Sequence, residues 1–519
     1  MNVIFLTQSN TLSLFYNLLK TFREKTEVDK VGFYIADSKF YNTFQKQHPE
    51  ISSNSLDLLK EWEIIGRSKK TMPDIERLRR YEKRLGDPVL WNALIADRRI
   101  YLGKRAMMEQ DYNSRFNHEN MLALLQTGLD EIEGIFDRVQ PDVVVGFICV
   151  TIGEYLAYLV AKSRNIQFLN LRPTRIRNYF FAGESVLEPS RQLEEIYRRM
   201  LSEGIPEHLQ QEVSSYLSEA RRTNAMYEGV VPATNPHGMG WKGIIKGMVS
   251  AAVNLGGLLK EYYEYNFGKY RHDNHYRGVF YKIWLKNIKR PARIRYADFF
   301  LRRHYISADK LRLIDYAFYP LHKEPEVTLL VYGRPYLNQI EVVCNYARSL
   351  PVGMKLVVKE HPAAIGYRPL SYYKKLLAIP NVVLAPPEIT SRELIQNVRM
   401  VTIIGGSIGF EALIMKKPVI IIGHAPFSFL PDTMIRYIQN MDNLSWEIKD
   451  LLKNHNHDEA ALMAYLAAVI DSSVSVDFYS ILLGKKGVYR PSGGIEKIDD
   501  QYQKQIERLS EYILNRIKC

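Results

Sequence analysis

The sequence predicts an α/β protein with two doubly wound units joined by a helical, basic segment. Apolar, β-branched runs alternate with helical patterns in the first third of the chain, and the same alternation returns after residue 317. A chain of 519 residues also has room for more than one domain. We therefore expect an N-terminal Rossmann-like domain over 1–186 and a helical insertion over 187–316. A C-terminal Rossmann-like domain follows over 317–497, and a helix over 498–519 packs back across the lobes.

Composition limits the partners and the compartment. The formal net charge is +13, which predicts anionic partners such as nucleic acid, an anionic membrane surface or acidic substrates. Three scattered cysteines are too few for a disulfide framework or a zinc cluster, so a reducing compartment is favoured. No run approaches the roughly 20 apolar residues of a membrane-spanning helix. We expect a cytoplasmic protein, at most peripheral to the inner face of the cell membrane.

The first unit begins as a strand at Asn2–Leu6 and continues with a second strand at Val31–Ala36. Another apolar strand at Val143–Ile148 leads to Glu154 at the head of an apolar helix. Open parallel sheets bind ligands at the carboxyl ends of their strands, so Glu154 is a candidate site residue.

Two further candidates come from the first unit. The charged segment Leu56–Asn113 is expected to be mostly helical, and within it Trp91–Tyr101 forms an amphipathic helix around Asp97. The alternative, an exposed and ion-paired helix face, explains Asp97 better than a site does. Arg172 begins a cluster of three arginines after the next strand. The cluster suits a carboxylate or a phosphate, and ordinary surface charge is an equal alternative.

The helical insertion is basic and aromatic. Lys269–Arg303 contains eleven lysines and arginines against two aspartates. An anionic bilayer surface, or an anionic lipid-linked or polymeric acceptor, would suit this stretch. The alternative is an insertion whose aromatic side chains form its core and whose basic face is solvated. No nucleic-acid motif accompanies the basic residues, so nucleic acid is not an expected partner.

The second unit is expected to start after an extended linker at Ala317–Glu326. Strands at Val327–Tyr332 and Lys355–Lys359 then alternate with helices. Gly333 and Arg334 follow the first of these strands and are assigned to substrate binding.

A glycine turn is the strongest functional signal in the chain. Val401–Ile404 reads as a buried strand, and Gly406, Ser407 and Gly409 then turn the chain into a short helix. Free N–H groups at a helix N-terminus favour a phosphate, and Glu411 lies one turn inside, within reach of ribose hydroxyls. The alternative is a generic strand–helix connection with a solvated glutamate.

His361 is the candidate that would act on a leaving group. It follows the strand Lys355–Lys359 in the run Lys359-Glu360-His361-Pro362, which points it into the expected cleft. A histidine there can donate a hydrogen bond to a leaving phosphate, although a lone histidine is more often structural. Lys359 is assigned to substrate binding beside it.

These motifs together resemble the bacterial capsule polysaccharide biosynthesis proteins. That group includes the β-Kdo transferases and is similar in style to the His-Pro-motif sialyltransferases. The resemblance covers roughly Phe318–Phe427, about a fifth of the chain. It is carried by Tyr319–His322, Lys359–Pro362, Ser391 with Leu394 and Ile395, Gly406–Leu413, and Lys417–Val419.

The resemblance implies a GT-B-like fold, two Rossmann-like domains facing a cleft, and a glycosyltransferase that needs no metal or other cofactor. It implies that His361 and Ser407 contact the donor phosphate, that Glu411 binds ribose, and that Ser391 contributes to substrate binding. The donor would often be a CMP-activated acidic sugar. This chain departs from the β-Kdo transferases after Val419, so UDP- and GDP-sugars stay open. The acceptor hydroxyl needs a base from the first lobe, for which Glu154 and Asp97 are the candidates.

The leading hypothesis is a glycosyltransferase that moves a sugar from a nucleotide-sugar to a surface or capsular polysaccharide, or to a lipid-linked acceptor. A nucleotide-sugar 2-epimerase is the first alternative, although a small soluble substrate needs no long basic insertion. The second alternative is a non-catalytic component of capsule assembly or export.

Overall fold

A computed structural model describes residues 1–52, 55–86, 90–97, 116–187, 189–223, 245, 249, 253, 255–274, 288–323, 326–361, 364–477, 481–482 and 498–518. Two predictions fall partly outside these residues: the second half of the helix expected over Trp91–Tyr101, and the middle of the basic stretch Lys269–Arg303. Among the described residues, no helix combines the length and the apolar character needed to cross a membrane.

The first sheet has seven strands in the order β13-β6-β5-β4-β1-β2-β3, and β6 is antiparallel to both of its neighbours. The strands are β1 (Val3–Thr7), β2 (Val31–Ile35), β3 (Leu56–Lys60), β4 (Val143–Phe147), β5 (Gln167–Pro173), β6 (Tyr179–Gly183) and β13 (Val474–Ser475). The helices between them are α1 (Thr11–Lys25), α2 (Ser38–Gln47), α3 (Glu61–Ser68), α4 (Ile75–Leu85), α5 (Leu90–Ala96), α7 (His118–Val139) and α8 (Ile152–Ser163). The predicted strands that became β1, β2 and β4 are confirmed. The segment interpreted as mostly helical instead opens with the edge strand β3.

The second sheet has six parallel strands in the order β12-β11-β10-β7-β8-β9. They are β7 (Tyr316–Pro320), β8 (Lys355–Lys359), β9 (Val382–Ala385), β10 (Met400–Ile403), β11 (Val419–Ile421) and β12 (Ile435–Tyr437). Its helices include α15 (Gln339–Ser349), α16 (Leu370–Leu377), α17 (Ser391–Asn397), α18 (Ser407–Ile414) and α19 (Leu444–Asn454). Buried side chains cover both faces of both sheets, as parallel sheets require. The predicted α/β fold with two Rossmann-like units is confirmed.

Two predictions at the start of the second unit are wrong. The first four residues of the expected linker belong to the strand β7 (Tyr316–Pro320) at the centre of the sheet, in which every residue is buried. The expected strand at Val327–Tyr332 is a short π-helical segment, η5 (Thr328–Tyr332), followed by the 3-10 turn η6 (Arg334–Tyr336). A short apolar run fits a buried strand and a buried helical turn equally well. Here the long-range pairing of β7 with β8 and β10 determines which of the two runs is the strand.

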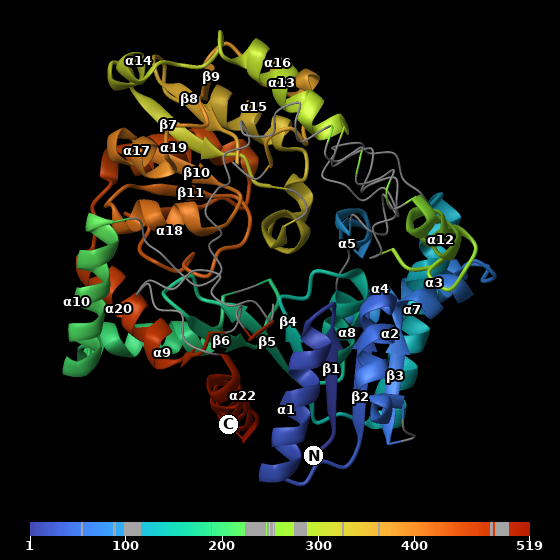
Figure 1. Cartoon of the computed structure of the whole chain (residues 1–519). Coiled ribbons are helices and arrows are strands. Elements are labelled where there is room, and N and C mark those ends of the chain that lie inside the picture. The colour runs from blue at the N-terminus through green and yellow to red at the C-terminus, as the bar shows by residue number, and fades with distance from the viewer. Residues whose placement is uncertain are drawn as a thin grey trace.

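The chain crosses between the two sheets more than once (Figure 1). The connecting helices are α9 (Arg191–Glu203), α10 (Glu207–Arg222), α12 (Leu255–Asn266), α13 (Arg290–Leu301), α14 (Ala308–Arg312), α20 (Glu459–Asp471) and α22 (Ile498–Lys518). α20 packs against α9 and α10, and α22 packs against α1, where the Asn17 amide donates to the Tyr502 hydroxyl over 2.8 Å. The C-terminal helix therefore returns to the first lobe and packs against its first helix.

Candidate functional site

The second sheet has a topological switch point between β7 and β10. The chain runs outward through β7, β8 and β9 on one side, then returns and runs outward through β10, β11 and β12 on the other. Ligands of open parallel sheets bind beyond the carboxyl ends of the strands at such a point, because the two crossover connections diverge there. In this chain those ends carry His322, which follows β7, and Gly405–Ser407, which follow β10.

The predicted glycine turn lies at that point. Gly406 has a φ of +101°, a conformation that suits glycine, and it is the residue from which α18 starts. A Cβ at Gly409 would lie 2.4 Å from Ile403 Cδ1, so the glycine lets α18 pack closely on β10. The helix begins at Ser407, inside the run Gly406–Gly409 that was assigned to the turn, so Ser407 lies in the first turn of the helix.

Ser407 and Glu411 lie together on α18, as predicted. The Ser407 hydroxyl lies near enough to the Glu411 carboxylate to lower its pKa. Desolvation by the surrounding chain raises the pKa of Glu411 to about 7, and the Ser407 hydroxyl and the charge of Arg392 oppose that rise. Arg392 also donates to the carbonyl oxygens of Ala220 (3.0 Å) and Thr223 (2.5 Å) at the end of α10. Glu411 is thus poised near neutral pH, next to a cation that is held by backbone carbonyls.

His361 follows a buried ionic network at the end of β8. The Glu360 carboxylate accepts from the Arg368 guanidinium, from the Tyr373 hydroxyl (2.7 Å) and from the backbone N–H of His361 (2.7 Å). Lys359 is buried, and desolvation lowers its pKa. The His361 side chain is exposed at the strand end, yet desolvation by the surrounding chain lowers its pKa, while Glu326 and Glu360 oppose that change. His361 is therefore neutral near pH 7 and can donate one N–H group.

Three other predicted residues, Gly333, Arg334 and Ser391, lie on elements around the glycine turn. A Cβ at Gly333 would lie 2.2 Å from Ile404 Cγ2, so this glycine allows η5 to approach the end of β10. The Arg334 guanidinium lies 3.8 Å from the ring centroid of Tyr155 on α8, which makes it a contact between the two lobes. Ser391 is the first residue of α17, which packs against α18.

The two carboxylates predicted as candidate bases meet at the start of α8. Asp97 Oδ2 accepts from the backbone N–H of Ile152 over 2.8 Å. Glu154 forms a reciprocal capping box with Thr151, whose N–H donates to Glu154 Oε2 over 2.9 Å. Asp97 is 2% exposed and Glu154 0%, so both carboxylates hold the helix start and neither faces solvent.

Arg172 lies apart from the other candidates. It is 6% exposed, and its guanidinium packs over the Phe181 ring at 5.7 Å from the centroid. A Cβ at Gly183 would lie 2.8 Å from Arg172 Nη2, so the side chain lies against β6. Its positive charge also reaches Tyr512 on α22.

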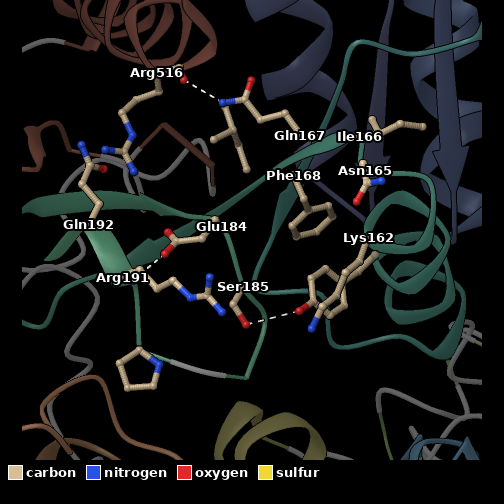
Figure 2. Close-up of a pocket in the computed structure, with 13 residues that line it drawn as sticks. Lys162, Asn165, Ile166, Gln167, Phe168, Glu184, Ser185, Arg191, Gln192 and Arg516 are labelled. Carbon is tan, nitrogen blue, oxygen red and sulfur yellow. Dashed lines mark hydrogen bonds between the residues drawn. The ribbon is translucent and has the colours of Figure 1, made fainter. Parts of the chain in front are cut away.

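A separate cavity of about 640 Å³ lies at the amino end of β5 (Figure 2). Lys162, Arg191 and Arg516 bring positive charge to its wall. Glu184 is held by the Ser190 hydroxyl (2.8 Å) and the Arg191 N–H (2.5 Å). Ligands of parallel sheets bind at the opposite, carboxyl edge, so this cavity is not part of the candidate site.

His322 has a position that the sequence analysis did not recognise. Its Nε2 accepts from the backbone N–H of Ile404 over 3.3 Å, and its carbonyl oxygen accepts from Gln339 Nε2 (2.9 Å) and Arg368 Nη2 (2.6 Å). Burial, together with the nearby charges of Arg368 and His361, lowers the pKa of His322 to about 3. The signal was present, because His322 directly follows an apolar run, but that run was interpreted as a linker.

Residues 263–437 match the model of the family described as capsule polysaccharide biosynthesis protein. The predicted family resemblance is confirmed. The matched capsule-biosynthesis segment runs from the last turn of α12 to the end of β12 and includes His322, His361, Ser407 and Glu411. The match supports a role in the synthesis of capsule polysaccharide. A comparison with curated proteins finds no match.

Among solved structures, the chain is similar to the KpsC β-Kdo 2,7 transferase of Thermosulfurimonas dismutans. The identity is 13% and the TM-score 0.34, over 73% of this chain and 89% of the transferase. It is also similar to the UDP-GlcNAc 2-epimerase of Methanocaldococcus jannaschii, with 14% identity and a TM-score of 0.24, over 91% of this chain and 98% of the epimerase. Both TM-scores are low, so the functional argument rests on the residues of the site.

Proposed function

We propose that the chain is a GT-B glycosyltransferase that moves a sugar from a nucleotide-sugar to a capsular polysaccharide or a lipid-linked glycan acceptor. The glycine turn at the switch point of the second sheet, with Glu411 one turn into α18, carries this proposal. The first N–H groups of α18 attract a phosphate, and a carboxylate one turn further along accepts hydrogen bonds from ribose hydroxyls. The match of the capsule-biosynthesis segment supports the same class of reaction.

The proposed reaction needs no metal. The bond between the sugar and the nucleotide phosphate breaks, and its electron pair stays on the phosphate oxygen. Neutral His361 donates a hydrogen bond to that oxygen, and Lys359 adds positive charge nearby. The acceptor oxygen forms the new bond to the anomeric carbon of the sugar, and the proton of that hydroxyl passes to Glu154 or Asp97. Because both carboxylates cap α8, this step requires the start of that helix to open as the lobes close.

A thermal-shift screen with CMP, CDP, UDP and GDP tests the donor site. A nucleotide that binds only the folded chain raises its unfolding temperature, and the base that raises it most identifies the donor class. Glu411→Gln should reduce the shift, whereas Glu341→Gln, on the exposed face of α15, should leave it unchanged. A wild-type chain that responds to no nucleotide would contradict the proposal and favour a non-catalytic role in capsule assembly.

A transfer assay then separates transferase from epimerase. The expected product is an extended acceptor glycan, formed equally well when a chelator is present. Donor incubated without acceptor should stay unchanged apart from slow hydrolysis. An epimerised donor sugar would establish the alternative activity instead.

We also propose that the chain works at an anionic membrane surface. Leu259 and Tyr263 of α12, and Phe267 directly after the helix, are exposed to solvent, with exposed fractions of 62%, 63% and 65%, and the three lie four residues apart. Lys260 and Lys269 accompany them. The side chains of Ile245, Val249, Val253 and Leu255 are also exposed. Apolar and aromatic side chains beside lysines suit the interface of an anionic bilayer.

Co-sedimentation with vesicles tests this surface. The chain should bind vesicles of phosphatidylglycerol and phosphatidylcholine more tightly than vesicles of phosphatidylcholine alone. Leu259→Ser combined with Phe267→Ser should weaken that binding, and Val352→Ser, a fully exposed position in the second lobe, serves as the matched control. Equal binding by the double variant and the wild type would refute the proposed surface.

A further inference from the structure

The space beside Gly406 is lined by two side chains with hydrogen-bonding atoms. The point that a Cβ would occupy at Gly406 lies 3.6 Å from Thr328 Oγ1, 3.8 Å from His322 Cε1 and 3.9 Å from His322 Nδ1. These residues come from η5 and from the end of β7, so three separate segments meet above the first turn of α18. The absence of a side chain at Gly406 leaves this space open to a ligand.

The hydrogen bond at the far side of the His322 ring fixes its tautomer. Nε2 accepts from the backbone N–H of Ile404, so in the neutral ring the proton must be on Nδ1. The ring is neutral near pH 7, because its pKa is lowered to about 3 by burial and by Arg368 and His361. Nδ1 is the ring nitrogen that faces Gly406, so His322 presents a donor to the open space.

Thr328 supplies a second donor. Its side chain is 8% exposed, and within the described part of the chain its hydroxyl has no hydrogen-bond partner. A threonine that is this deeply buried as a residue normally has a hydrogen-bond partner within the protein. The hydroxyl points to the same space beside Gly406, where a bound oxyanion would satisfy it.

We propose that His322 Nδ1–H and the Thr328 hydroxyl complete a phosphate subsite with the first N–H groups of α18. The subsite rests on the proposed nucleotide-sugar donor and assigns its phosphate to three elements rather than to the glycine turn alone. A phosphate oxygen accepts readily from such donors, and a neutral imidazole keeps its donor in place across the range in which other histidines titrate. His361, exposed at the end of the neighbouring strand β8, then acts at the leaving oxygen.

The test compares nucleotide binding by calorimetry with binding of the matching nucleoside, which lacks the phosphate. Thr328→Val keeps the shape of the side chain and removes the donor. Thr402→Val is its matched control, since Thr402 is buried in β10 and donates to Phe318 O (3.2 Å) within the sheet. Thr328→Val should weaken nucleotide binding by about 10-fold or more, the usual effect of a lost hydrogen bond to a charged group. Nucleoside binding should not change, and Thr402→Val should leave both unchanged.

Two substitutions of His322 separate a phosphate donor from a purely structural role. The amide of His322→Asn reaches the position of Nδ1, and the amide oxygen of His322→Gln reaches the position of Nε2. If His322 holds phosphate, the Asn variant keeps more nucleotide affinity than the Gln variant. If His322 only accepts from Ile404, the Gln variant keeps more, and the proposal is overturned. Unfolding temperatures of both variants identify any loss that comes from misfolding.

Inorganic pyrophosphate separates the subsite from the proposed function. Nucleotide binding that is strong in the wild type and unchanged in all variants overturns the subsite and leaves the function standing. Pyrophosphate binding that Thr328→Val weakens, in a wild-type chain that binds no nucleotide, supports the subsite and overturns the nucleotide-sugar donor. A wild-type chain that binds neither overturns both.

Discussion

Glu411→Gln should stabilise the chain, and the gain should grow with pH. The Glu411 carboxyl is desolvated on α18, which raises its pKa to about 7 from the ordinary value of 4.5. Between these two values the unfolded chain has an ionised Glu411 and the folded chain a protonated one. The stability that comes from the neutral carboxyl is fully present below about pH 4.5 and is lost as the pH rises through about 7. The uncharged amide of the Gln variant would carry no such penalty.

The pKa shift sets the size of the effect. A difference of about 2.5 units between the folded and unfolded states corresponds to about 3 kcal/mol at most, from 1.36 kcal/mol per unit. At pH 5 only a small part of this difference is present. The free energy of unfolding of the Gln variant should therefore exceed that of the wild type by less than about 1 kcal/mol at that pH. At pH 8 the gap should approach the full value. The Ser407 hydroxyl is retained in both proteins and can donate to the amide oxygen of the variant as well.

Equilibrium unfolding in urea at pH 5, 6, 7 and 8 measures this gap. The midpoint of Glu411→Gln should move away from that of the wild type as the pH rises, at an unchanged slope. Glu341→Gln, in which an exposed carboxyl of the same lobe is replaced, should run parallel to the wild type at every pH. A constant gap between Glu411→Gln and the wild type across this range would refute the raised pKa and, with it, the desolvated position of this carboxylate.

Three further variants test other parts of the site. Glu154→Gln keeps the capping box, which accepts glutamine, but removes the base. The transfer rate should therefore fall by about 100-fold or more, while the free energy of unfolding stays within about 0.5 kcal/mol of the wild-type value. An unchanged transfer rate would show that Glu154 acts only as a helix cap. Gly409→Ala places a Cβ 2.4 Å from Ile403 Cδ1 and should cost about 1–3 kcal/mol of stability in urea unfolding, whereas a neutral result would contradict the tight packing of α18 on β10. Arg368→Met leaves the buried Glu360 carboxylate without its cation and should cost about 3–5 kcal/mol in the same assay, and the double variant with Glu360→Gln should recover part of the loss.

The parts of the site that follow from local pattern were predictable from sequence. Val401–Ile404 and Gly405–Gly406 indicate a buried strand and a turn in the residues themselves. A helix after the turn was expected as well, although in the structure it already begins at Ser407, inside the run that was assigned to the turn. The placement of His361 depended only on the strand Lys355–Lys359, which is equally clear. Each of these elements is defined within about ten residues of the chain, where periodicity and turn chemistry decide.

The parts that were missed depend on contacts between distant segments. Tyr316–Pro320 and Thr328–Tyr332 are both short, apolar and aromatic, and only the pairing of the first with β8 and β10 makes it the central strand. Because the strand was assigned to the second segment instead of the first, the sequence analysis placed His322 in a linker and not at the end of a strand. The approach of Thr328 to the glycine turn was missed for the same reason. The same holds for Arg392, whose partners at Ala220 and Thr223 lie about 170 residues earlier in the chain.

The position of β7, which was expected to be a linker, also explains why two histidines with different roles lie at this site. β7 and β8 are neighbours in register, with Pro320 opposite Lys359, so the residues that follow them emerge side by side at one edge of the sheet. Arg368 joins these two ends, because it pairs with the Glu360 carboxylate and donates to the His322 carbonyl oxygen over 2.6 Å. Its charge helps to keep His322 neutral, while His361 stays exposed beyond the network. Burial and the charge of Arg368 thus keep His322 neutral beside the glycine turn, whereas His361 lies at the solvent edge, where the proposed reaction places the departing phosphate oxygen.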